Sequence, residues 1–155
     1  MKIGVISDTH DHLDPRVASL FEGVDHILHA GDIGLPWLIM QLEGIAPVTA
    51  VLGNNDFGKE FKETEIIQLA GRKFLLHHIV DARSPAPPIQ RRIVREAPDV
   101  VVFGHTHKPF NEMIGGTLYF NPGYAGRPRF GLVRTVAILH CDAGGIRAEF
   151  KELGP

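Results

Sequence analysis

Short clusters of histidine, aspartate and asparagine recur between residues 8 and 107 of this 155-residue chain. Two of the clusters, Asp8-x-His10 and His105-x-His107, place metal-binding side chains two positions apart. On an extended segment such residues point the same way, so we expect each pair to supply two convergent ligands. Oxygen and nitrogen donors without sulfur suit manganese, iron, zinc or nickel. The candidate ligands are Asp8, His10, Asp32, Asn54, His77, His105 and His107.

This set of ligands is too large for one tetrahedral ion and fits two metals that share a bridging carboxylate. The clusters follow apolar runs that we predict to be strands. The first three runs are Lys2–Ser7, His26–Ala30 and Pro47–Leu52. Helices predicted at 15–22, with Asp14 as N-cap, and at Leu35–Leu42 separate them, which indicates a parallel sheet. The carboxyl edge of such a sheet is where ligands bind, so we expect the clusters to meet there.

The second half of the chain is richer in hairpins. A hairpin is predicted around Ala70 and Gly71, a proline-rich loop follows, and a helix with one apolar face comes before a buried strand. Two stacked sheets with helices outside accommodate both halves. The predicted segments are Glu63–Leu69, Arg72–His78, Val80–Pro88 (loop), Pro88–Ala97 (helix), Val100–Phe103, Met113–Asn121, Val133–Cys141 and Ile146–Leu153.

Composition narrows the class of protein. Apolar residues make up 44% and charged residues 22%, which is typical of a globular chain, and the length predicts a single domain over residues 1–155. The lone Cys141 excludes an intrachain disulfide and a cysteine-built metal site. A net charge of -2 gives no bulk positive field for nucleic acid. No apolar run reaches the ~18–20 residues of a membrane span, and we expect a cytoplasmic protein without a signal peptide.

The order of the motifs resembles that of the calcineurin-like metallophosphoesterases, in particular their small microbial phosphodiesterase branch. The family pattern is D-x-H, G-D, G-N-x-D, H and G-H-x-H. It appears here as Asp8/His10, Gly31-Asp32, Gly53-Asn54-Asn55-Asp56, His77 and Gly104-His105-Thr106-His107, followed by Asn121-Pro122-Gly123. The resemblance implies an α/β fold, a four-layer αββα sandwich with two mixed β-sheets flanked by helices.

The resemblance also implies a site with two divalent transition-metal ions, with manganese as first choice and iron, zinc or nickel as alternatives. The first ion would take Asp8, His10, Asp32 and His107. The second would take Asp32, Asn54, His77 and His105, with Asp32 bridging. A hydroxide between metals ~3.5–4 Å apart would attack phosphorus in line. Two divalent ions, two carboxylates and one hydroxide leave a charge of about +1 for an anionic phosphate.

Three motif positions leave their roles open. Asn55 stands where phosphatase branches have a histidine that assists the leaving group, and asparagine cannot supply that proton. Asn55 contacts substrate or forms a turn. Asp56 after it has a turn role, which we favour, or a catalytic one. We favour His77 over His78 as the ligand, which leaves His78 as an extra acid or a rim residue.

The candidate catalytic residues are therefore Asn55, Asp56 and His78, and the candidate substrate contacts are Asn54, Asn55 and His12. We expect a phosphodiesterase, with phosphomonoesters as further substrates, that acts on a small phosphoester rather than long nucleic acid or a membrane. The alternative is a metal-binding interaction module like the retromer subunit of this fold. A homodimer is also expected, because hairpin edges are exposed.

Overall fold

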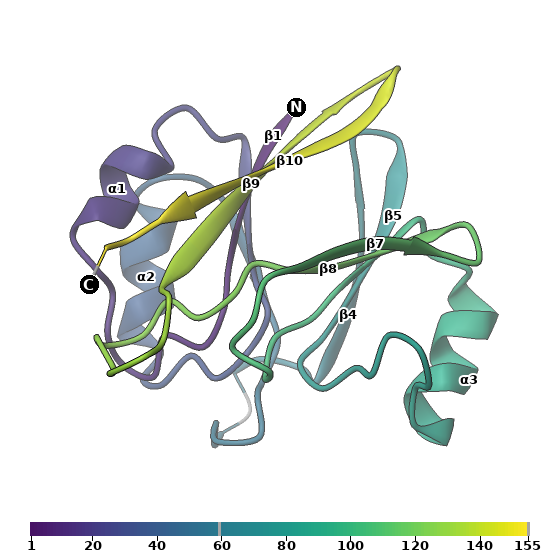
Figure 1. Ribbon diagram of the computed structural model, residues 1–155, viewed down its shortest axis with the longest axis horizontal. Helices are drawn as coiled ribbons and strands as arrows, with labels where there is room; N and C mark the ends of the chain where they lie inside the picture. Colours follow the sequence, from purple (N-terminus) through teal and green to yellow (C-terminus); the bar gives the residue numbers. More distant parts are fainter. Residues whose placement is uncertain (59, 155) are drawn as a thin grey trace.

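The computed structural model describes residues 1–58 and 60–154, and in these residues the strands form two five-stranded sheets (Figure 1). In the first sheet, β1 and β2 run parallel with Val5 opposite Leu28, and β3 continues the parallel arrangement. β9 runs antiparallel to both β1 and β10. The order across this sheet is β10 (Gly145–Glu152), β9 (Thr135–Asp142), β1 (Lys2–Ile6), β2 (His26–His29) and β3 (Val48–Ala50).

The second sheet is also mixed, with β5, β6 and β8 parallel and a hairpin at each edge. The predicted segment Met113–Asn121 turns at Gly115 and Gly116, so its residues belong to the two strands of a hairpin. The order across this sheet is β4 (Thr64–Leu69), β5 (Arg72–His77), β6 (Val100–Val102), β8 (Thr117–Asn121) and β7 (Phe110–Ile114).

The helices lie outside the two sheets. Figure 1 shows α1 (Arg16–Leu20) and α2 (Trp37–Glu43) at one side of the molecule and α3 (Pro87–Glu96) at the other. Apolar side chains from α1 and α2 pack on the first sheet, whereas Ile89 of α3 packs on Leu75 of the second. The predicted four-layer α/β sandwich is therefore confirmed. The helix expected at 15–22 is shorter at both ends, and its N-cap is Pro15 rather than the expected Asp14, whose carboxylate accepts from Arg16 N.

The layer between the sheets holds the sandwich together. Val5, Leu28, Phe74 and Val102 are fully buried there. Burying each such side chain contributes about 1.5–3 kcal/mol. This packing fixes the second sheet against the first, so the carboxyl ends of strands from both sheets meet at one edge. Gly104 N donates to the carbonyl of His78 at that edge, and His78 Nδ1 lies 2.7 Å from Ala30 O in the first sheet.

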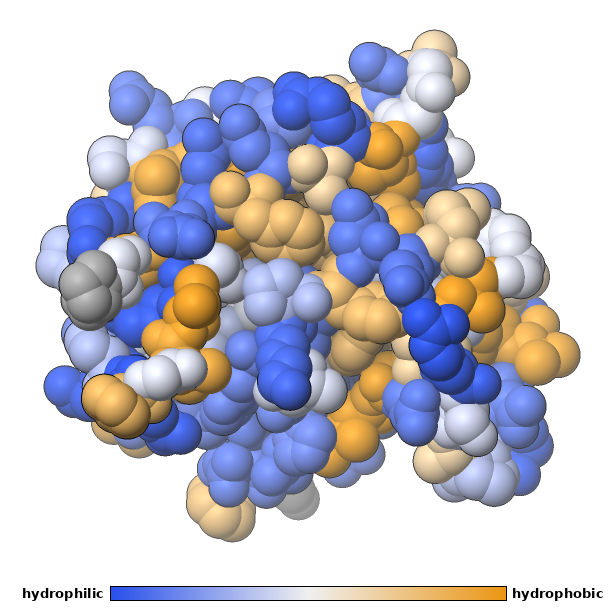
Figure 2. All heavy atoms as spheres, viewed as in Figure 1, coloured by the Kyte–Doolittle hydropathy of each residue, from blue (hydrophilic) through white to orange (hydrophobic). Residues whose placement is uncertain are grey.

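On the face shown in Figure 2, apolar patches alternate with hydrophilic side chains. Among the described residues, no helix is both long enough and apolar enough to cross a membrane.

Candidate metal centre

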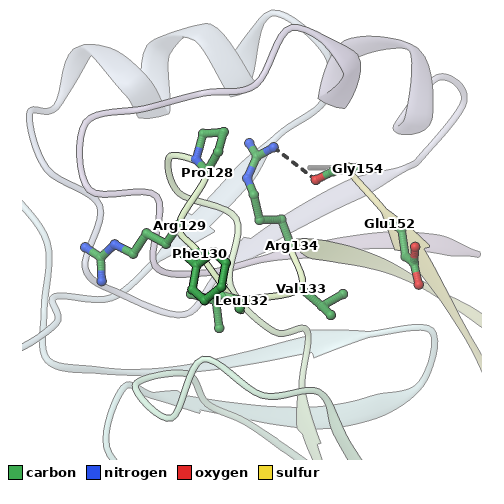
Figure 3. Close-up of a pocket in the computed structure, with 9 residues that line it drawn as sticks. Pro128, Arg129, Phe130, Leu132, Val133, Arg134, Glu152 and Gly154 are labelled. Carbon is green, nitrogen blue, oxygen red and sulfur yellow. Dashed lines mark hydrogen bonds between the residues drawn. The ribbon is translucent and has the colours of Figure 1, made fainter.

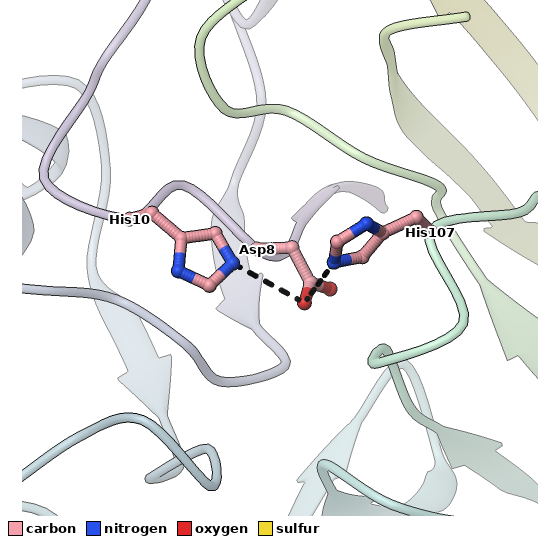
Figure 4. A group of neighbouring side chains, drawn as sticks. All are labelled: Asp8, His10 and His107. Atoms are coloured by element: carbon pink, nitrogen blue, oxygen red, sulfur yellow. Dashed lines mark ion pairs between the residues drawn. The ribbon is translucent and has the colours of Figure 1, made fainter. Parts of the chain in front are cut away.

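Two carboxylates and three imidazoles converge where β1, β2, β5 and β6 end. In the first group, His107 Nε2 lies 3.3 Å and His10 Nε2 3.9 Å from Asp8 Oδ1 (Figure 4). In the second group, His78 Nε2 lies 3.3 Å from Asp32 Oδ2 and 3.8 Å from Asp8 Oδ1. Asp32 Oδ2 also lies 3.6 Å from His10 Nε2, so this carboxylate stands between His10 and His78.

Left-handed backbone turns make these side chains converge. The expectation of extended segments was wrong, because five of the candidate ligands have positive φ angles. A residue with a Cβ in such a conformation costs about 1–3 kcal/mol, which a fold retains chiefly at functional sites. The angles are 58° for Asp8, 45° for His10, 54° for Asp32, 70° for His105 and 64° for His107.

Gly104, which precedes His105, gives the carboxylate of Asp8 the space that it needs. A Cβ at this position would lie 2.6 Å from Asp8 Oδ2 and 3.2 Å from His78 Nδ1. Any side chain would therefore push the ligand groups apart, since real Cβ contacts are not that short. The glycine of the G-H-x-H motif is explained by this close approach.

Three ligand atoms that face the centre lack hydrogen-bond partners in the part of the chain that the structure describes. Asp8 Oδ2 accepts from Ser7 Oγ at 2.7 Å and from His105 N at 3.1 Å, which leaves Oδ1 free. Among residues 1–58 and 60–154, Asp8 Oδ1, His10 Nε2 and His78 Nε2 are buried without a partner. Buried polar atoms normally have hydrogen-bond partners, so a group of ligand atoms that converge without partners fits a bound cation. The donor set, which has no sulfur, suits the first-row ions expected from the sequence.

Charge interactions between the groups shift their pKa values. Burial opposes the ionisation of Asp32, but the nearby His78 imidazole and hydrogen bonds from Asn55 outweigh it and lower the pKa of Asp32. Burial likewise opposes protonation of His78, and the carboxylates of Asp32 and Asp8 outweigh it and raise the pKa of that ring. A carboxylate held ionised in this way can bind a metal ion without first losing a proton.

His78, not His77, joins the cluster, which corrects the choice made from the sequence. Leu75 and His77 occupy the same face of β5, the face that α3 covers, because side chains alternate along a strand. His77 Nδ1 lies 2.8 Å from Thr64 Oγ1 on β4. His78 follows the end of the strand, and its Nδ1 contact with Ala30 O directs Nε2 toward Asp32. The sequence shows this alternation but not which face of β5 packs under α3.

Asn54 and His105 lie beside the second group. His105 Nδ1 is 3.1 Å from Asn54 Oδ1, and the His105 ring centroid is 5.4 Å from that of His78. Both residues are exposed at the mouth of the site. They are therefore placed to complete the coordination of an ion held by Asp32 and His78.

Asn55 and Asp56 have supporting contacts. The backbone N and the Nδ2 of Asn55 each donate to Asp32 at 2.9 Å, so Asn55 orients this carboxylate. The Asp56 carboxylate accepts from the backbone nitrogens of Gly53, Ile33 and Gly34 at 2.8–3.0 Å. Asp56 therefore has the turn role that we favoured, and its carboxylate faces backbone rather than a reacting group.

His12 stays outside the cluster. It lies half-buried in the loop after β1, and its backbone nitrogen donates to Thr9 O. Burial and the charges of Arg127 and Arg134 lower the pKa of His12. Among the described residues, the His12 side chain makes no ion pair with Asp8 or another acid, so a contact with substrate stays a prediction.

Residues outside the set of candidate ligands support those ligands, and of these Tyr124 was not singled out from the sequence. The buried Tyr124 ring is tilted by 39° to the His107 ring with 4.7 Å between the ring centroids, and Tyr124 stands just after Gly123 of the motif region. Buried His29 lies 2.9 Å from Thr9 Oγ1, and burial lowers its pKa to about 3, so this ring is neutral. Asn121 Nδ2 donates to the carbonyl of Gly104 at 3.0 Å and so supports the G-H-x-H loop.

Two cavities border the centre, and a third lies apart from it. One of about 200 Å³ borders Asn54 and His78, and one of about 470 Å³ borders His105. The cavity drawn in Figure 3, about 620 Å³, lies by the 128–134 loop, where Arg134 Nη1 donates to Gly154 O. Its lining contains none of the candidate ligands, so it is separate from the metal centre.

Comparisons with known proteins agree with this geometry. Residues 1–144 match the calcineurin-like phosphoesterase superfamily domain. The chain is 33% identical over 162 residues to a probable metallophosphoesterase of Methanothermobacter thermautotrophicus, covering 99% of this chain and 94% of the relative. It is 31% identical over 160 residues to a phosphodiesterase of Methanocaldococcus jannaschii, covering 87% of this chain and 93% of that protein.

Two solved structures share the fold. A novel archaeal phosphodiesterase has a TM-score of 0.80 at 28% identity, covering 99% of this chain and 100% of that one. Vps29 of Entamoeba histolytica, complexed with zinc, has a TM-score of 0.77 at 23% identity, covering 99% and 100%. The likeness to Vps29 shows the fold alone.

Proposed function

Since the chain belongs to the calcineurin-like phosphoesterase superfamily, we propose that it hydrolyses phosphodiester bonds, with phosphomonoesters as further substrates. One observation carries the proposal. Buried ligand atoms of Asp8, His10 and His78 converge at the carboxyl edge of both sheets, with no hydrogen-bond partner among residues 1–58 and 60–154. Such a cluster binds cations and, through them, the anionic oxygens of a phosphoester.

The residues fit two divalent transition-metal ions, with manganese as our first choice. Asp8, His10 and His107 would hold one ion. Asp32 and His78 would hold the other, and Asn54 and His105 stand beside them. When bound, such ions polarise the phosphoryl oxygens and lower the pKa of the attacking water.

Specific contacts orient three of these ligands, namely His78, Asp8 and Asp32. In the neutral ring of His78, the Nδ1 proton faces the carbonyl of Ala30, so the lone pair of Nε2 faces the site. Ser7 and the backbone of His105 fix Asp8, and Asn55 fixes Asp32. Partners of this kind are worth 10–100-fold in metal affinity.

Charge favours diesters over monoesters. Asp8, Asp32 and a hydroxide would give the cluster three negative charges, and Asn54 is neutral, so two divalent ions would leave a charge of about +1. A singly charged diester matches this small excess. Asn55 cannot donate a proton, so we propose that esters with acidic leaving groups, such as nitrophenyl esters, are the better substrates.

The test is a hydrolysis panel on protein reconstituted with Mn²⁺. We expect cleavage of bis(4-nitrophenyl) phosphate that a chelator abolishes and Mn²⁺ restores. The variant His107→Ala should lose most of the activity, and Arg147→Ala on β10 serves as a matched surface control. A folded, metal-loaded sample that cleaves neither diesters nor monoesters would refute the proposal.

The interaction module is the second candidate, and the Vps29 fold favours it. A module without catalysis would tolerate the loss of ligands, whereas this chain keeps a complete cluster of Asp8, His10, Asp32, His78 and His107. A panel with no cleavage, together with retained zinc binding, would support the module instead.

A further inference from the structure

A further cavity, of about 800 Å³, lies between α3 and the edge of the second sheet. We name it the arginine groove, because Arg91, Arg92 and Arg95 of α3 line it together with His77. The motifs of the metal centre do not account for these arginines. Arginine is the side chain best suited to phosphate, since its planar guanidinium donates two parallel hydrogen bonds.

The arginine groove adjoins the small cavity beside the metal centre. The smaller cavity beside Asn54 and His78 shares three lining residues with it, namely Glu63, His77 and Ile79. His77 is fixed at this junction by its contact with Thr64 Oγ1. A molecule with one end at the metal ligands can therefore extend past His77 into the arginine groove.

Positive charge exceeds negative charge in the arginine groove. Three cations share the carboxylate of Glu96 beside the groove, which lies 3.7 Å from Arg92 Nε, 3.6 Å from Arg95 Nε and 3.8 Å from Lys73 Nζ. These distances are too long for hydrogen bonds. Among the described residues, Arg92 Nε is buried without a hydrogen-bond partner and no acid lies within ion-pair distance of Arg91. Glu63 offsets only part of the positive charge of the three arginines, so guanidinium N–H groups are available to an anion.

We propose that the arginine groove binds a second phosphate group of the substrate. The substrate class is then a small phosphodiester whose retained alcohol carries a terminal phosphate. The scissile phosphate would lie at the metal centre and the terminal phosphate beside Arg92 and Arg95. This inference rests on the proposed function for its catalytic part, but binding in the arginine groove needs no catalysis.

Two substrates with the same leaving group test the catalytic part. Thymidine 5′-(4-nitrophenyl phosphate) has one phosphate, and its 3′-phosphorylated form has two. We expect the Mn²⁺-loaded enzyme to show a KM at least tenfold lower for the second substrate, with a similar kcat. Arg92→Ala combined with Arg95→Ala should remove the difference through KM, whereas Arg147→Ala should keep it. Equal KM values for both substrates in the parent enzyme would overturn the inference and leave the proposed function standing.

Titration calorimetry on metal-free protein tests the groove separately. Thymidine 3′,5′-bisphosphate should bind at least tenfold more weakly to the double arginine variant than to the parent or to Arg147→Ala. If no ester is hydrolysed but this difference appears, the proposed function fails and the anion site stands. If the variants bind the bisphosphate equally, the inference fails. Tighter binding of a single-stranded oligonucleotide than of the bisphosphate would also overturn it in favour of a nucleic-acid surface.

Discussion

With the two metal ions that we propose, replacing His78 should remove one ion, and replacing its neighbour His77 should remove none. His78 Nε2 lies 3.3 Å from Asp32 and has no hydrogen-bond partner among the described residues, whereas His77 contacts Thr64 on the face that α3 covers. The two variants His78→Ala and His77→Ala therefore form a matched pair of adjacent histidines with opposite expected outcomes.

The size of the effect follows from linkage. An ion at a concentration 100 times its Kd stabilises the folded state by about 2.7 kcal/mol, so two ions contribute about 5 kcal/mol. For a chain of this length each kcal/mol raises Tm by about 2–4 °C, so saturating Mn²⁺ should raise Tm by about 10–20 °C. His78→Ala keeps the ion held by Asp8, His10 and His107, so about half of that rise should remain. His77→Ala should keep all of it.

The assay is thermal unfolding with and without Mn²⁺, together with metal analysis of the dialysed protein. Each variant is compared with its own metal-free form, so the cavity left by the missing ring cancels. The reasoning is refuted if His77→Ala binds one ion while His78→Ala still binds two. It is also refuted if both variants show the full metal-induced rise in Tm.

Three further predictions concern the side-chain contacts of Arg134, Asp14 and Asn55. Arg134→Met breaks a buried pair, since Arg134 Nη2 donates to the Asp14 carboxylate at 2.8 Å, and it should cost about 3–5 kcal/mol, or about 6–20 °C in Tm by calorimetry. Hydrogen bonds from Arg16 and Arg134 hold the pKa of Asp14 below its ordinary value, so its stabilising effect should be complete above a pH of about 4 and be lost as the pH falls further. An Asp14→Asn variant should lack that acid dependence in urea titrations, and an unchanged profile would contradict the assignment. Asn55→Ala should lower Mn²⁺ affinity 10–100-fold through Asp32 but leave the dependence of kcat/KM on leaving-group pKa unchanged. If kcat/KM of the parent enzyme hardly changed with leaving-group pKa, another group would have to donate the proton.

The fold could be predicted from the sequence because its signals are local. Apolar runs such as His26–His29, with turn residues between them, gave the strands and their order, and the structure confirms two mixed sheets with helices outside. The family could be predicted too, because its motifs stand in order along the chain. Errors occurred where a boundary depends on competing contacts, as in α1, where Asp14 accepts from Arg16 and from Arg134.

The sequence by itself determined which residue types are available for metal binding and that they follow strand ends. Only the tertiary structure decided which of two adjacent histidines enters the centre. Side chains alternate along β5, so His77 faces α3, and the stacking of the second sheet on the first brings Ala30 O to His78 Nδ1. The left-handed turns at Asp8 and Asp32 are likewise fixed by contacts between distant segments, such as Asp8 N with Gly31 O. Motif spacing does not encode these contacts, because they join residues that only the packing of the two sheets brings together.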